Sequence, residues 1–247
     1  VVWDTGADRL ERFVPFPPPA IRPGSFLNDL AVDLLHDAVY IADLGGDRGP
    51  ARIVVDLLTG FSRRVLEDHP SVQAEDVPLA LEGRTVMVTQ GDGAQDELRV
   101  GVNPITIDPS FTWVYWGAMN GTSLWRVRAR DLADATLDGD ALAARVERYG
   151  DKPVSDGISI DTAGNVYVTD LASSGIGVTA PDGSYRLLYR DERLSWPDGL
   201  SAGADGWMYV TSSQLHRSAL LHEGTGAAEP PFYVMRFRPL ADAVVGR

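Results

Sequence analysis

Oxygen-bearing side chains recur at equivalent positions along this chain, each opening a short apolar segment. They are Asn28, Asn103, Asp156 and Asp198, which begin the segments NDLAVD, NPITID, DGISID and DGLSAG. Carboxylate and amide oxygens are the ligands that hard cations such as Ca²⁺ or Mg²⁺ prefer. A divalent cation held there could polarise a carbonyl or activate a water. The alternative is structural, because Asp and Asn also cap turns by accepting hydrogen bonds from backbone amides.

Each opening is followed by a second strand pattern whose tyrosine lies 11 or 12 residues later. The four second strands cover residues 39–41, 114–116, 166–168 and 208–210. Further strand patterns and Asp-Gly or Pro-Asp-Gly turns follow, as expected for antiparallel meanders. Four-stranded units of about 40–45 residues are typical of propeller blades. We therefore predict an all-β chain forming a single β-propeller domain over residues 1–247.

This architecture predicts where the recurring side chains meet. The innermost strands of a propeller line its central channel, so the four openings should converge at one mouth. The loops after the second strands should join the same face. The predicted metal ligands are Asn103, Asp156 and Asp198. The predicted ligand-binding residues are Asn28, Asp29, Trp116, Asn120, Asp170, Trp196 and Gln214.

Two histidines are candidates for acid–base catalysis, because imidazole titrates near neutral pH. They are His69, in DHPSV, and His216, in QLHR. A structural hydrogen bond in a loop is the alternative for each. The sequence contains no nucleophile elbow, phosphate loop or dinucleotide fingerprint, so no nucleotide cofactor is expected.

Some regions interrupt the strand rhythm. Residues 67–100 predict an inserted polar loop with a hairpin that pairs 85–88 with 97–100. A helix is predicted near 138–149, with Asp138 in a capping position. Long insertions on a rigid scaffold often carry binding specificity. The chain opens in mid-blade, because 1–5 resembles a third strand and 9–14 a fourth. About four and a half blades are therefore expected in this sequence.

Composition limits the partners. The 247 residues carry a net charge of -13 and include no cysteine. The acidic balance argues against a nucleic-acid partner. Disulfides, thiolate metal sites and cysteine nucleophiles are excluded. No apolar run reaches the roughly 18 residues of a membrane span, and no signal peptide is visible. The oligomeric state stays open.

Several motifs resemble the major royal jelly protein/yellow family. They are SFLNDLAVD at 25–33, HPSV at 69–72, GDKPVSDG at 150–157, LSWPDG at 194–199, QLHR at 214–217 and PPF at 230–232. The resemblance covers nearly the whole chain and is greatest to bacterial members. It implies a six-bladed β-propeller, related more distantly to the gluconolactonase/regucalcin-like lactone hydrolases. It also implies that about one and a half blades normally precede Val1.

The resemblance leaves the function open among several classes. It implies a small molecule handled at the channel mouth, by an isomerase or tautomerase like the dopachrome converters, or by a metal-assisted lactone hydrolase. The alternative is a secreted, non-enzymatic protein that binds a biogenic amine, and the family favours a secreted or periplasmic location. In the lactonase-like relatives a Glu, an Asn and an Asp hold a divalent cation such as Ca²⁺. Asn103 and Asp156 match that Asn and Asp. The Glu would come from a blade that this sequence lacks, and Pro104 replaces the usual Gly.

Overall fold

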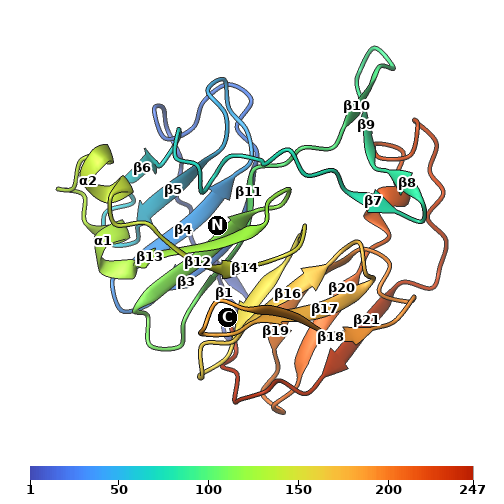
Figure 1. The fold of residues 1–247 in the computed structure, drawn as a ribbon. Coiled ribbons are helices and arrows are strands. Elements are labelled where there is room, and N and C mark those ends of the chain that lie inside the picture. Colours follow the sequence, from blue (N-terminus) through green and yellow to red (C-terminus); the bar gives the residue numbers. More distant parts are fainter. Residues whose placement is uncertain (247) are drawn as a thin grey trace.

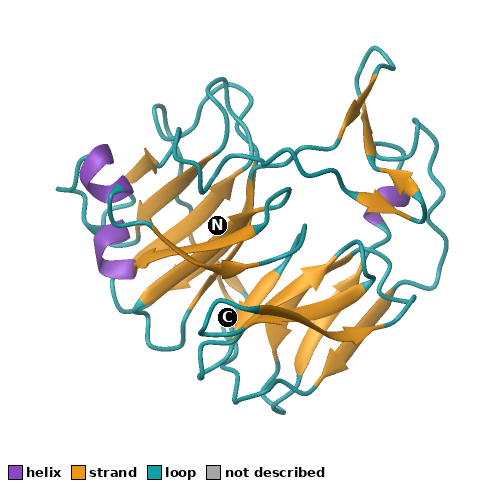
Figure 2. Cartoon of the chain, in the orientation of Figure 1, coloured by secondary structure: helices purple, strands orange, loops and turns teal. Residues whose placement is uncertain are grey.

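The strand patterns around the repeated tyrosines fold into antiparallel sheets in the computed structural model, which describes residues 1–246. Figure 2 shows that strands and loops make up nearly all of this part of the chain. Four sheets follow one another in chain order around a common centre (Figure 1). The prediction of an all-β propeller is confirmed, with four blades in the described residues.

The blades are consecutive meanders. The first contains β3 (Leu27–Asp33), β4 (Ala38–Asp43), β5 (Ala51–Asp56) and β6 (Ser62–Val65). The second contains β11 (Val102–Ile107), β12 (Trp113–Ala118), β13 (Ser123–Arg128) and β14 (Glu147–Asp151). The third contains β15 (Ile158–Ile160), β16 (Val166–Asp170), β17 (Gly175–Thr179) and β18 (Tyr185–Arg190). The fourth contains β19 (Pro197–Ala202), β20 (Met208–Ser212) and β21 (Tyr233–Phe237).

The repeated tyrosine has a structural role in most blades. Its hydroxyl donates a hydrogen bond to the aspartate of the turn between the first two strands. The pairs are Tyr40 with Asp33 at 2.7 Å, Tyr167 with Asp161 at 2.8 Å, and Tyr209 with Asp205 at 2.7 Å. A buried tyrosine hydroxyl needs such a partner. The repeated tyrosine therefore stabilises the turn between the first and second strands. This turn lies at the end of the blade opposite the Asn or Asp residue that begins the first strand.

Packing between blades brings the first strands together. β3 lies beside β11, β11 beside β15, and β15 beside β19. Apolar side chains such as Val54, Ile105 and Trp116 fill the space between the first two blades. The third and fourth blades approach closely at Gly157, since a Cβ there would lie 2.1 Å from the carbonyl oxygen of Asp198. The openings of these two blades are thereby held against each other.

The half blade expected at the start is present as a hairpin of β1 (Val2–Asp4) and β2 (Arg9–Arg12). The helix predicted near 138–149 is shorter than expected. Asp138 caps it as predicted, accepting a hydrogen bond from the Ala141 amide at 2.8 Å, but α2 covers only Gly139–Ala143. Residues 147–149 belong to β14, because pairing with β13 satisfies their backbone groups. A second short helix, α1, covers Ala129–Ala133.

The inserted segment, residues 67–100, lies across the mouth side of the second, third and fourth blades (Figure 1). It contains β7 (Ala80–Leu81), β8 (Arg84–Thr85), β9 (Met87–Thr89) and β10 (Gln95–Glu97). Its apolar residues, including Leu79, Leu81 and Leu98, pack on loop residues of those blades. The predicted hairpin is shifted: Met87 pairs with Glu97, and the Val100 amide binds the side chain of Asn120 instead.

A one-turn 3₁₀ helix, η1 (Leu215–Arg217), follows β20 beneath this segment. None of the helices in residues 1–246 has the length and apolar character needed to cross a membrane.

Candidate functional site

A chain of hydrogen bonds links the openings of the first three blades. The Asn28 amide donates to the side-chain oxygen of Asn103, and the Asn103 amide donates to Asp156 Oδ1. Trp196 Nε1 donates to Asp156 Oδ2 at 2.6 Å. The predicted convergence at one mouth is thus present for Asn28, Asn103, Asp156 and Trp196. Asp156 is the centre of this chain, with both carboxylate oxygens engaged.

The backbone around Asp156 is fixed from the neighbouring strand. The Thr169 hydroxyl accepts hydrogen bonds from the amides of Asp156, at 3.1 Å, and Gly157, at 2.9 Å. Asp156 is 6% exposed and Thr169 is fully buried. The carboxylate is therefore held in place from its backbone and from both of its oxygens. Sequence reasoning did not select Thr169, since a threonine within a strand carries no distinctive signal.

Three carboxyl groups lie close enough at the mouth to affect one another. Burial and the nearby Asp198 and Asp156 raise the pKa of Asp29 to about 7, although Arg52 opposes the shift. Burial and repulsion from Asp198 also raise the pKa of Asp156, against the hydrogen bonds from Trp196 and Asn103. Burial raises the pKa of Asp198 too. Desolvation and like charge both disfavour the ionised form.

None of these three carboxylates has an ion-pair partner within 4.0 Å among residues 1–246. Asp29 and Asp198 also line a cavity of about 220 Å³, together with apolar residues of the innermost strands. These apolar residues include Leu30, Ile105 and Ile158. The cavity therefore combines two half-buried carboxyl groups with partly apolar lining, an arrangement suited to a cationic ligand with an apolar body.

Arg52 is a buried cation that sequence reasoning missed. It projects from β5, is fully buried, and its guanidinium has no hydrogen-bond partner among residues 1–246. The guanidinium lies over the Trp116 ring, 5.0 Å from its centroid. Burial lowers the pKa of Arg52 to about 9, against the attraction of Asp29. A lone arginine in the apolar run ARIVV was the available signal.

Trp196 joins the mouth to the inserted segment. Its ring stacks on that of His216, with centroids 5.9 Å apart and an interplanar angle of 10°. His216 Nε2 lies 3.4 Å from Glu82 Oε1, and Arg217 donates a hydrogen bond to the same carboxylate. The predicted His216 is therefore adjacent to the site but separated from Asp156 by the indole.

The other predicted ligand-binding residues hold loops in the structure. The Asn120 side chain forms two hydrogen bonds with the inserted segment. Its Nδ2 donates to Val77 O and its Oδ1 accepts from Val100 N, each at 2.9 Å. Asp170 accepts hydrogen bonds from the Tyr185 hydroxyl and the Ser173 amide. Gln214 binds the backbone of Glu229, and Trp116 donates to Ser71 O at 3.2 Å. Their contact with a ligand stays a prediction.

His69 also has local partners. Its Nδ1 lies 2.8 Å from the Ser71 hydroxyl, and its ring meets Trp125 edge-on at 6.0 Å. Burial lowers the pKa of His69. Trp125 belongs to β13, the third strand of its blade, so these contacts lie away from the innermost strands. The predicted catalytic role of His69 has no further support from its position.

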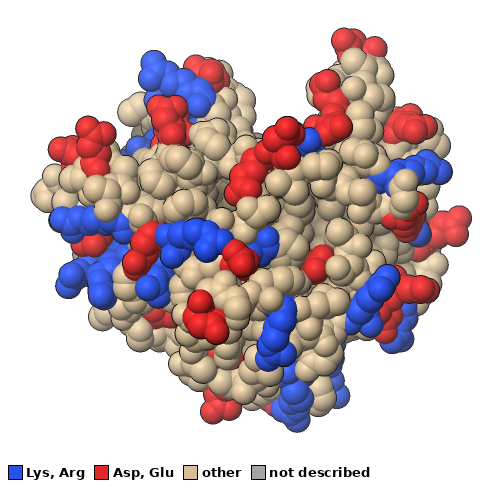
Figure 3. Space-filling model, viewed as in Figure 1, with Lys and Arg blue, Asp and Glu red and all other residues tan. Residues whose placement is uncertain are grey.

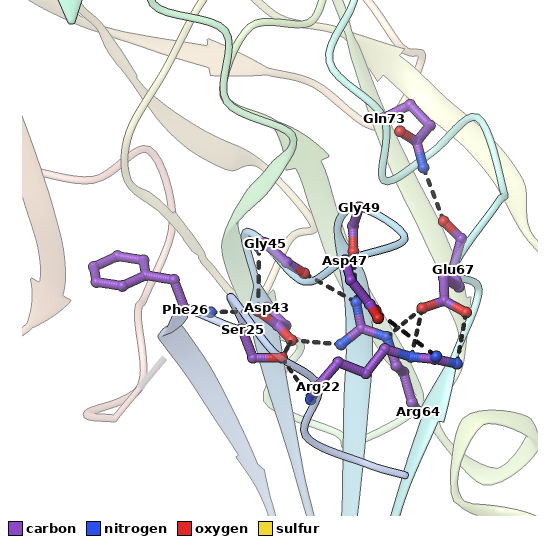
Figure 4. Close-up of polar contacts among 10 residues, drawn as sticks. All are labelled: Arg22, Ser25, Phe26, Asp43, Gly45, Asp47, Gly49, Arg64, Glu67 and Gln73. Atoms are coloured by element: carbon purple, nitrogen blue, oxygen red, sulfur yellow. Dashed lines mark hydrogen bonds and ion pairs between the residues drawn. The ribbon is translucent and has the colours of Figure 1, made fainter. Parts of the chain in front are cut away.

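A second polar cluster supports the loop after β4 (Figure 4). Asp43 is fully buried and accepts hydrogen bonds from the Phe26 and Gly45 amides, the Ser25 hydroxyl and Arg64. Arg64 also binds Glu67, at 2.7 Å. Because these groups satisfy one another, the cluster is a structural anchor for the loop and leaves Asp43 no free oxygen lone pair directed at the mouth.

Lys152 is a further buried group that the sequence did not reveal. Its ammonium donates to the carbonyls of Gly121 and Pro153 and to the Ser155 hydroxyl, at 2.9–3.0 Å. Burial lowers the pKa of Lys152 to about 7, against the attraction of Glu75. The side chain joins the loops of the second and third blades and binds Ser155, the residue before Asp156.

The predicted divalent-cation site would need a different arrangement of these groups. The Asn103 amide presents its NH₂ group to Asp156, and the second Asp156 oxygen is taken by Trp196. Within residues 1–246 no three His, Asp or Glu side chains are grouped as metal ligands. As arranged, the residues do not fit a divalent cation, and no chemistry through a metal is derived from them.

The carboxylate cluster is local. Acidic and basic side chains are interspersed over the face seen in Figure 3, so the net charge of -13 is not gathered into one surface patch there.

Comparison with known proteins agrees with this architecture. The family model described as major royal jelly protein matches residues 1–228. The extracellular domain assigned to a hybrid two component system of B. thetaiotaomicron is 15% identical with a TM-score of 0.50; the match covers 88% of this chain and 23% of that one. A catalytically inactive virginiamycin B lyase from Staphylococcus aureus is 13% identical with a TM-score of 0.43, covering 88% and 71%. Among curated proteins no match was found. At these identities the structural likeness concerns the fold alone.

Proposed function

Because the chain belongs to the major royal jelly protein family, and family membership indicates a fold more firmly than an activity, we propose a function from the mouth residues themselves. The protein binds a small organic amine at the mouth of its central channel. The observation that carries this proposal is the cluster of Asp29, Asp156 and Asp198, in which burial raises each pKa and the charge of Asp198 raises those of the other two, and in which no carboxylate forms an ion pair within residues 1–246.

Electrostatics favour a cation at this position. Ionising all three carboxyl groups in a partly desolvated site is unfavourable, and a bound ammonium group would relieve their repulsion. Arg52 offsets part of this charge at Asp29 but forms no ion pair with it. A single positive charge on the ligand therefore complements the site better than a neutral or anionic group.

The cavity limits the size of the ligand. Its volume of about 220 Å³ is below the roughly 300 Å³ from which drug-sized pockets begin. Leu30, Ile105, Ile158 and Leu200 supply apolar surface beside Asp29 and Asp198. An amine with one aromatic ring and a short side chain matches this combination of volume, apolar wall and charge.

A second function is favoured by one specific observation. Asp29 has a pKa of about 7, so it could accept and donate a proton near neutral pH, as an isomerase or tautomerase requires. Amine binding and proton transfer use the same carboxyl group. Turnover of a bound amine or of its oxidised products would distinguish the two functions. Metal-assisted lactone hydrolysis has less support, because the oxygens of Asn103 and Asp156 are already hydrogen-bonded.

Isothermal titration calorimetry at pH 8 with 2-phenylethylamine tests the proposal, with 2-phenylethanol as a neutral ligand of the same shape. We expect the amine to bind and the alcohol to bind at least tenfold more weakly, a difference of about 1.4 kcal/mol. Asp198→Asn should weaken amine binding by a similar factor, whereas Asp140→Asn, an exposed carboxylate on α2, should not. Equal affinities for amine and alcohol, or for the two variants, would contradict amine binding.

Ca²⁺ is titrated in parallel. Saturable Ca²⁺ binding that Asp198→Asn abolishes, in the absence of amine binding, would favour the divalent-cation site predicted from the sequence.

A further inference from the structure

His216 and Asp156 contact opposite parts of one indole. Trp196 donates from Nε1 to Asp156, and its ring face stacks on the imidazole of His216. Trp196 is 1% exposed and His216 is 7% exposed. In so closely packed a site, the orientation of the indole depends on both neighbours. A displacement of the imidazole would therefore alter the hydrogen bond to Asp156.

The imidazole is also a contact of the inserted segment. Its Nε2 lies 3.4 Å from Glu82, which follows β7, and neither ring nitrogen has a hydrogen-bond partner among residues 1–246. His216 borders a small cavity of about 140 Å³ between the inserted segment and the loop after η1. Apolar side chains of the segment pack on Trp196 in the same region. The segment thus rests on the ring pair formed by Trp196 and His216.

Protonation of His216 is unfavourable in this arrangement. The neutral ring needs one donor and one acceptor contact, whereas the charged ring would bring a second N–H group into a site with no acceptor for it. Burial lowers the pKa of His216, and although Glu82 raises it, Arg217 and His222 lower it further. Arg84 and Glu223 are the other charged groups that border the adjoining cavity.

The direction of the effect follows from linkage. A histidine whose pKa is lowered in the packed state supports that state fully above its ordinary pKa of about 6.5, and support is lost as pH falls below it. Acidification therefore favours states in which the imidazole has left the indole. The same change removes a constraint on Trp196 and on the segment that packs over it.

We propose that His216 is a positioning residue that works as a pH switch for the mouth. Neutral His216 keeps Trp196 on Asp156 and the inserted segment over the site, and its protonation releases both. This inference rests on the proposed function in one consequence only, which is that a bound amine is released more readily below about pH 6.5.

The switch is tested on the protein without ligand. Tryptophan fluorescence between pH 5 and 8 should change with a midpoint below about 6.5, and amide exchange in residues 77–100 should be at least several-fold faster at pH 5.5 than at 7.5. His216→Phe keeps an aromatic ring on Trp196 but cannot titrate, so both changes should disappear. His222→Asn removes a histidine of the same loop and should leave both changes in place.

A second variant covers the case in which His216→Phe does not fold. Glu82→Gln removes the carboxylate that favours the imidazolium, and the fluorescence midpoint should move to lower pH. The proposal is overturned if His216→Phe retains the wild-type titration, or if Glu82→Gln leaves the midpoint unchanged. Because neither readout needs a ligand, failure of 2-phenylethylamine to bind would refute amine binding and leave the switch to be judged by its own data.

Discussion

Replacing Asp29 by Asn should stabilise the protein, and by more at pH 8 than at pH 5. The substitution keeps the shape of the side chain and removes its charge. Burial and two neighbouring carboxylates raise the pKa of Asp29 from 3.8 to about 7. At about 1.36 kcal/mol per pKa unit, this shift corresponds to about 4 kcal/mol when the group is fully ionised.

The sign follows from linkage. A carboxyl group whose pKa is raised by folding binds its proton more tightly in the folded state, so stability falls as pH rises from about 4 to about 7. Near pH 5 the unfavourable contribution is about 1.5 kcal/mol, and near pH 8 it approaches about 4 kcal/mol. The gain in Asp29→Asn should therefore be about 2.5 kcal/mol larger at pH 8 than at pH 5. Part of it arises because Asp156 and Asp198 lose a repulsive neighbour.

Urea unfolding at both pH values measures the effect, provided that the m-value is unchanged. Asp140→Asn, on the exposed face of α2, serves as the control and should show no pH-dependent gain. An equal stability change for Asp29→Asn at pH 5 and pH 8 would refute the reasoning, because it would mean that Asp29 titrates as an ordinary surface carboxyl group.

Three further substitutions test other buried groups. Arg52→Met should raise the free energy of unfolding at pH 5 by about 1–3 kcal/mol. The reason is that the guanidinium is buried without hydrogen bonds, whereas a thioether would still pack on Trp116. Lower stability in urea unfolding would contradict this. Lys152→Met should cost about 3 kcal/mol, because it leaves the carbonyls of Gly121 and Pro153 without their donor; an unchanged Tm would show that these carbonyls find other partners. Asn120→Ala removes two hydrogen bonds to the inserted segment, so amide exchange in residues 77–100 should accelerate by about tenfold or more while the blade strands keep their protection. Uniform acceleration throughout the chain would instead indicate global destabilisation.

The repeat was readable from the sequence because its cause is local. The tyrosine of each second strand and the aspartate of the preceding turn are close in sequence, and Tyr40 and Asp33 or Tyr167 and Asp161 form a hydrogen bond across one turn. Strand alternation adds a signal of period two. The predicted element boundaries were wrong where they depend on contacts between residues far apart in the sequence. Residues 147–149 fall within the predicted helix but belong to the strand that pairs with β13, and in the inserted segment the Val100 amide binds the side chain of Asn120 instead of extending the predicted hairpin.

In the candidate site, too, some side-chain positions could be predicted from the sequence and others could not. Asn28, Asn103, Asp156 and Asp198 were predicted to meet because a propeller places equivalent positions at one end. Hydrogen bonds join the first three of these side chains and Trp196. Asn120, Asp170 and Gln214 occupy similar loop positions, yet their side chains hold the loops. Sequence position alone could not separate these two groups.

The sequence by itself determined the strand repeat, the propeller fold and the side of the molecule on which the recurring Asn and Asp residues gather. The tertiary structure alone decided that the Asn103 amide faces Asp156 as a donor, that Arg52 lies unpaired over Trp116, and that His216 stacks on Trp196 beneath the inserted segment. The physical reason is distance along the chain. Strand periodicity and turns depend on neighbours within about ten residues, whereas pKa values and side-chain orientation depend on desolvation and charges that only folding brings together.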